Sequence, residues 1–129
     1  MAPNCIVETL AELGVWAEPI VVDMLHLAYC ARSRDGRAPP DLVRRHALIW
    51  RAIFAGADDI RRRHEVTLGH GLSIAGFGRS HFDYANARVI EELAAIIDAR
   101  TRCSPRSARR FHRTLLSLRA RLEPLKIAA

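Results

Sequence analysis

Apolar residues recur at intervals of three and four along most of this chain, which is the spacing of helices that bury one face. The clearest case lies within residues 41–65, where positions 42, 46, 49, 53, 56 and 60 alternate steps of four and three. This is the seven-residue repeat of packed helices. We therefore expect an all-α fold with five or six helices around one core, forming a single domain over residues 1–129.

Two helices are predicted in the first third of the chain. The first is short, with Asn4 as its N-cap and Gly14 at its end. The second begins at Pro19, since proline suits the first turn of a helix, and it runs to about Ser33. This second helix is apolar on almost every side, so we expect it to be the most buried helix of the core.

Residues 41–65 leave one question open. If Gly56 does not break the segment, it forms a single helix; otherwise Gly56 is a joint and Asp58 caps a new helix. Glycine costs only about 1 kcal/mol inside a helix, so both alternatives stand. His46 lies in the apolar seam of this segment, and we interpret it as a hydrogen-bonded histidine of the core or of its boundary.

Residues 66–79 depart from the helical pattern. They contain four of the seven glycines of the chain. The added backbone freedom favours a Gly-rich loop, whereas residues 66–68 and 72–74 would also fit a small β-hairpin. The glycines lack the spacing of a phosphate-binding loop, so a structural turn is the expected role.

Two further helices are predicted near the end of the chain. Ser80 begins a capping box and opens a helix that runs to about Thr101. Ser104 and Pro105 form the clearest helix start in the sequence, an N-cap serine followed by proline at the first helical position. This last helix is expected to end before Pro124.

Charge is sorted along the chain into blocks of alternating sign. Residues 1–31 carry a net charge of −4, residues 32–63 +5, residues 64–99 −3 and residues 100–129 +8, for a total of +6. Such sorting lets segments of opposite sign attract one another, and it places a strong positive field on the last segment.

The last predicted helix gathers its arginines on one face. At about 100° per residue, the apolar residues of this helix lie on one side and the basic residues on the other. The basic face carries Arg106, Arg109, Arg110, Arg113 and Arg121. Guanidinium groups form charge-assisted hydrogen bonds with carboxylates and phosphates, so we expect these five arginines to bind an acidic partner. The alternative is a solvated face that pairs with the protein's own acidic segments.

The expected function is a non-enzymatic helical binding module that docks on an acidic macromolecule, with a protein partner or a second copy of the chain as first choice. One alternative is a small nucleic-acid-associated protein that binds mainly through phosphate contacts. A second is an enzyme or ligand binder that uses residues 64–83. No catalytic residue, metal ligand or cofactor is assigned. The sequence has no nucleophile elbow and no carboxylates paired at a suggestive spacing, and the zinc motif H-E-x-x-H fails at Leu68.

The sequence also favours a reduced, intracellular setting. Glu8 and Glu12 stand where a secretory leader would be apolar, and no stretch approaches the length of a transmembrane helix. The three cysteines are widely spaced and odd in number, which is typical of reduced thiols. We expect a basic protein of a bacterial cytoplasm.

Overall fold

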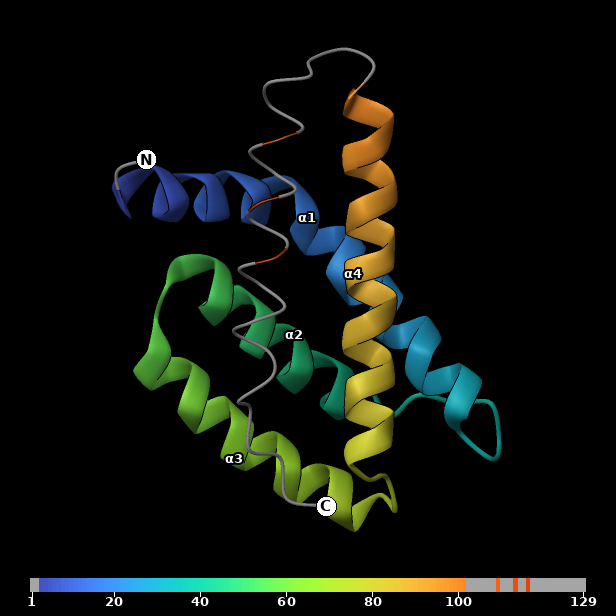
Figure 1. The fold of residues 1–129 in the computed structure, drawn as a ribbon. Helices are drawn as coiled ribbons and strands as arrows, with labels where there is room; N and C mark the ends of the chain where they lie inside the picture. Colours follow the sequence, from blue (N-terminus) through green and yellow to red (C-terminus); the bar gives the residue numbers. More distant parts are fainter. Residues whose placement is uncertain (1–2, 102–108, 110–112, 114–115, 117–129) are drawn as a thin grey trace.

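The computed structural model describes residues 3–101 together with residues 109, 113 and 116 (Figure 1). Residues 3–101 form four α-helices and contain no strand: α1 (Pro3–Arg32), α2 (Pro40–Ala55), α3 (Asp58–Ile74) and α4 (Arg79–Thr101). Helix α1 packs on both α2 and α4, and α2 in turn packs on α3. The all-α fold is confirmed for these residues. The additional helix predicted from Ser104 lies outside them, apart from the three isolated positions.

The first two predicted helices are one continuous helix. Helix α1 runs through Gly14 and contains Pro19 in its interior, so neither residue marks a boundary. An interior proline removes one backbone hydrogen bond and crowds the preceding turn, which bends a helix without necessarily ending it. In Figure 1, α1 changes direction near its middle. The half that follows the bend buries Val21, Leu25 and Tyr29, so the expectation of a deeply buried segment holds for one face of this half.

Gly56 is a joint between two helices. Its φ of 68° places it in the left-handed region, and its N–H donates to the carbonyl of Ile53 at 3.1 Å. The Ala57 N–H then donates to the carbonyl of Ala52 at 2.9 Å, which completes the cap of α2. Glycine reaches this conformation without the strain of a β-carbon, so the chain reverses here and α3 begins at Asp58.

The loop or hairpin predicted over residues 66–79 does not form in its first two thirds. Helix α3 continues through Gly69 and Gly71 to Ile74, and the turn before α4 is confined to residues 75–78. A β-carbon at Gly71 would lie 2.9 Å from Leu42 Cδ2 and 2.9 Å from Arg45 Nη1, both on α2. The glycine therefore allows α2 and α3 to approach closely, and this packing outweighs its low helix propensity.

A chain of hydrogen bonds crosses the apolar core and joins three helices. The hydroxyl of Tyr29 on α1 lies 2.7 Å from His46 Nδ1 on α2, and His46 Nε2 lies 2.7 Å from Asn86 Oδ1 on α4. The indole N–H of Trp50 donates to the same oxygen at 2.9 Å. Because Asn86 Oδ1 only accepts, the proton of neutral His46 must be on Nε2, and Nδ1 accepts from the tyrosine hydroxyl.

Burial of this network shifts the pKa values of its titratable members. His46 is 0% exposed and stacks on the Phe82 ring at a centroid distance of 4.7 Å. Loss of hydration disfavours its charged form and lowers the pKa of His46 to about 4. The same cause raises the pKa of Tyr29 well above its ordinary value. His46 is thus a neutral core residue with both ring nitrogens hydrogen-bonded, which confirms the interpretation from sequence.

Candidate functional site

Two of the five arginines predicted to bind a partner lie within the described residues. Arg109 and Arg113 occupy helical positions and are exposed. They are four residues apart, so a continuous helix would place them on the same side. Arg106, Arg110 and Arg121 lie outside the described residues, and the role of the five as one face stays a prediction.

Most carboxylates between residues 17 and 95 already face an arginine of the same chain. Seven of the ten do so, and six of the seven ion pairs join residues three or four apart on one helix. The pairs are Asp41–Arg44, Glu18–Arg51, Asp58–Arg61, Glu65–Arg61, Asp59–Arg62, Asp83–Arg79 and Glu91–Arg88. The acidic residues of these helices are therefore largely occupied by local partners.

Several arginines of the same range form no described ion pair, and three of them cluster where α1 leads into α2. Arg34 and Arg37 are exposed on the loop between these helices. Arg32 ends α1, and its guanidinium carbon lies 4.3 Å from the centre of the Tyr84 ring, a cation–π contact. Positive charge is therefore concentrated at this end of the molecule.

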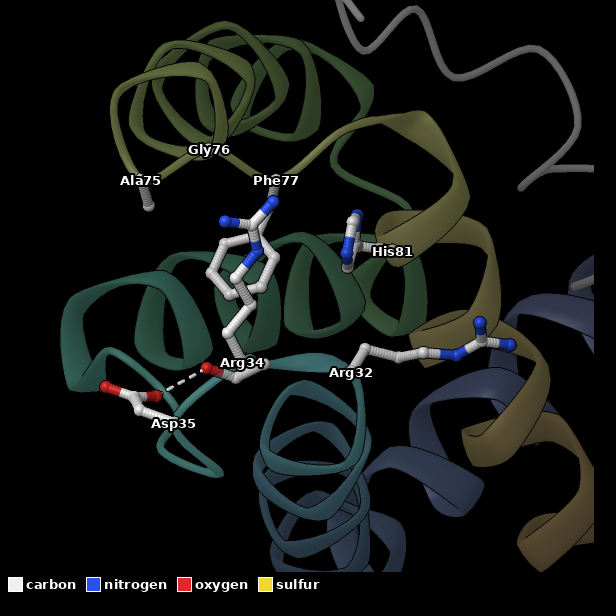
Figure 2. Close-up of a pocket in the computed structure, with 8 residues that line it drawn as sticks. Arg32, Arg34, Asp35, Ala75, Gly76, Phe77 and His81 are labelled. Carbon is white, nitrogen blue, oxygen red and sulfur yellow. Dashed lines mark hydrogen bonds between the residues drawn. The ribbon is translucent and has the colours of Figure 1, made fainter.

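A cleft of about 660 Å³ opens beside these arginines, between the end of α1 and the turn from α3 to α4 (Figure 2). This volume is within the range of ligand pockets, which is roughly 300–1,000 Å³. Its lining residues are Arg32, Ser33, Arg34 and Asp35 on one side and Ala75, Gly76, Phe77 and His81 on the other. Two segments at least forty residues apart in the sequence thus form one site.

Asp35 is the only acidic residue of the cleft lining, and its carboxylate is held by its own loop. Its Oδ1 accepts from the Ser33 hydroxyl at 2.6 Å and from the Arg37 backbone N–H at 3.0 Å. These two hydrogen bonds, that of Ser33 first, lower the pKa of Asp35 from its ordinary value. In Figure 2 the carboxylate lies at one edge of the cleft, away from His81.

The opposite wall of the cleft is aromatic. Gly76, with φ of 80°, follows the end of α3, and the Phe77 N–H bonds back to the Leu72 carbonyl at 2.9 Å. This turn sets the Phe77 ring edge-to-face with the rings of Tyr29 and His81, at centroid distances of 5.7 and 4.8 Å. The ring is therefore fixed by contacts from two directions.

His81 combines a structural and a chemical role. Helix α4 begins at Arg79, one residue before the predicted cap Ser80, so His81 is the third helical residue. Its Nδ1 accepts from the Gly78 N–H at 3.0 Å, the contact that Glu makes in a capping box. In the neutral ring the proton must then be on Nε2, which remains able to donate to a ligand.

A second groove lies between α2 and α3. It measures about 650 Å³ and is lined by Arg45, Glu65, Val66, Thr67, Gly69, His70 and Ser73. Glu65 is buried here and pairs with Arg61. Residues of the 64–83 segment line parts of two separate clefts, and the alternative of an enzyme or ligand binder that uses this segment stays a prediction.

The part of the chain that the structure describes brings together no three metal-ligating side chains. Cys30 Sγ lies 3.7 Å from His26 Nε2, one turn away on α1. None of the helices described is long and apolar enough to cross a membrane. No family model matches the chain, and no curated protein or solved structure is significantly similar to it.

Sequence reasoning missed the cleft. Residues 33–40, S-R-D-G-R-A-P-P, have the composition of a loop, and the Arg and Asp residues among them are the sequence signal for one wall of the cleft. The other wall of the cleft, which residues 75–81 form, is not predicted, because the sequence pattern extends the loop over residues 66–79 instead of confining it to residues 75–78. Only the length of α3 places Phe77 and His81 opposite Arg34.

Proposed function

We propose that this protein is a non-enzymatic helical binding module that docks on an acidic macromolecule, a protein partner or a second copy of the chain. The observation that supports the proposal is the distribution of ion pairs. Seven of the ten carboxylates between residues 17 and 95 already have arginine partners within these helices. Few counter-charges are left there for any further basic segment.

The sequence places its excess positive charge in such a segment. Residues 3–101 contain 12 basic and 13 acidic residues, whereas residues 102–129 contain eight basic residues and one acidic residue. Between residues 17 and 95, only three of the ten carboxylates lack an arginine partner, which is too few to balance a net charge of +7. An external acidic surface is therefore the favoured counterpart of Arg106, Arg109, Arg110, Arg113 and Arg121.

The alternative partner is a nucleic acid, because guanidinium groups bind phosphates as well as carboxylates. Two defined probes separate these possibilities: a fluorescent polyglutamate peptide and a fluorescent DNA duplex. Anisotropy titrations of each with the full chain, at about 50 mM and about 300 mM salt, give affinities and salt dependence. Light scattering of the chain alone at the same salt concentrations measures self-association.

A pair of matched variants tests the arginine face. The first replaces Arg106, Arg110 and Arg113 with Gln. The control replaces Arg44, Arg62 and Arg88, which have the same total charge but carboxylate partners within the chain. We expect the first variant to lose polyglutamate binding or self-association and the control to retain it.

Each outcome bears on the proposal. Equal losses in the two variants would mean that only net charge matters, and the arginine face would be rejected. Tight duplex binding with no binding of polyglutamate and no self-association would replace the proposal with the nucleic-acid alternative. If the chain binds neither probe and remains monomeric at low salt, both are wrong.

A further inference from the structure

We propose that the cleft between the end of α1 and the α3–α4 turn binds a small aromatic anion, an anionic oxygen group attached to a flat ring. Arg34 and the Nε2–H of His81 would hold the anionic group, and the ring would lie against Phe77. This site is distinct from the predicted arginine face, so it stands or falls independently of the macromolecular partner.

The first argument is electrostatic. Arg32 and Arg34 line the cleft, and neither forms an ion pair among the described residues. The cation–π contact with Tyr84 holds Arg32 at one side. The one carboxylate of the lining, that of Asp35, is already hydrogen-bonded to Ser33 and to the backbone of its own loop. The cleft lining therefore sets two cationic side chains, neither of them in a described ion pair, against one carboxylate that is held by its own loop.

The second argument is the direction of the donors. In Figure 2 the Arg34 side chain extends from its loop towards the α3–α4 turn, and His81 faces the same opening from the first turn of α4. The cap contact with the Gly78 N–H occupies His81 Nδ1, so the Nε2–H on the other side of the ring is not used by the cap. The N-terminal end of α4 also carries the positive end of its helix dipole, which favours an anion beside His81.

The third argument is the aromatic wall. Phe77 is only half-buried although Tyr29 and His81 pack edge-to-face against it. A ring held in this way offers apolar surface at little further entropic cost on binding. A ligand with both a ring and an anionic group would use both walls of the cleft, whereas a bare anion would use one.

The test is a titration of the full chain with phenyl phosphate, benzoate, inorganic phosphate and benzyl alcohol. Binding is followed by NMR through the imidazole resonances of His81 and by calorimetry. We expect saturable binding of phenyl phosphate or benzoate that shifts these resonances, and the preferred one identifies the anionic group. Inorganic phosphate and the neutral alcohol should each bind about tenfold more weakly, since each lacks one half of the recognition.

Three variants make the test specific to the cleft. Arg34→Gln should weaken binding about tenfold, whereas Arg37→Gln, which removes the same charge from the same loop outside the lining, should leave it nearly unchanged. His81→Glu keeps an acceptor for the Gly78 N–H, so α4 stays capped, but it places a negative charge in the cleft and should abolish binding. Circular dichroism and thermal unfolding confirm that each variant is folded.

Several results would overturn the proposal. Non-saturable binding, or binding that leaves the His81 resonances unchanged, would show that the ligand does not occupy the cleft. Equal losses in Arg34→Gln and Arg37→Gln would reduce the effect to general charge. If inorganic phosphate binds as tightly as phenyl phosphate, Phe77 contributes nothing and the aromatic part of the proposal is wrong.

Discussion

The buried histidine should make the fold sensitive to mild acid. His46 has a pKa of about 4 in the folded protein against an ordinary value of 6.5, because burial removes the hydration of its charged form. Between these two values the unfolded chain binds more protons at this residue than the folded chain does. The free energy of unfolding therefore falls as the pH is lowered through this interval.

The size of the effect follows from the two pKa values. They differ by about 2.5, and one pKa unit corresponds to about 1.4 kcal/mol, so the full loss is about 3 kcal/mol. The loss begins near pH 6.5, reaches about three quarters of its full size by pH 4.5 and levels off at about pH 3. For a domain whose total stability is about 5–15 kcal/mol, this is a large fraction.

Urea unfolding at pH 7.5 and pH 4.5 measures this loss, and a His46→Gln variant isolates the contribution of the histidine. Glutamine can still donate to Asn86, but it binds no proton in this range. The variant should be less stable than the natural chain at pH 7.5, yet it should lose about 2–3 kcal/mol less on acidification. If both proteins lose the same amount, the acid sensitivity arises from the carboxylates, and our account of the core is refuted.

Three further changes test other features. Asn86→Leu keeps the number and branching of the side-chain heavy atoms but leaves two buried N–H donors without an acceptor. Urea unfolding should show a loss of about 2–4 kcal/mol, and a loss of less than about 1 kcal/mol would contradict the hydrogen-bond network. In Gly56→Ala the added β-carbon has no atom within 4 Å, so the only cost is the strain of the left-handed backbone. Thermal unfolding should show a loss of stability of about 1 kcal/mol. Replacing Arg106, Arg110 and Arg113 with Gln should alter stability by about 0.5 kcal/mol or less per change, whereas a much lower melting temperature would indicate that these arginines pair within the protein.

The helical class could be read from the sequence because a long apolar period is a strong signal, but the helix boundaries depended on weaker ones. Gly56 ends a helix and Gly71 does not, although both glycines lie in segments with helix-forming apolar neighbours. The difference lies in the surroundings: Gly71 faces Leu42 at close range, whereas a β-carbon at Gly56 would meet nothing. Local propensity amounts to about 1 kcal/mol in each case, so tertiary packing decides.

The same reasoning explains what could be predicted of the polar core and the cleft. The apolar neighbours of His46 on its own helix indicated that it is buried, but its partners come from Tyr29 and Asn86, 17 and 40 residues away. Such pairings appear only when three helices are placed together. The cleft depends likewise on a loop and a turn that are distant in sequence. Of its properties, only the positive charge of the segment 32–63 can be predicted from the sequence.

The attachment of α3 has a consequence for motion. Among the helices described, its extensive packing is on α2, and it presents Ile60, Val66 and Ile74 to solvent. A helix held mainly along one side can open without breaking the Tyr29–His46–Asn86 core, so its amide protons should exchange through local openings before those of the second half of α1. Because α3 leads directly into the turn that carries Phe77, we expect each such opening to widen the cleft as well. A ligand could therefore enter or leave on the timescale of this local breathing, while the rest of the protein stays folded.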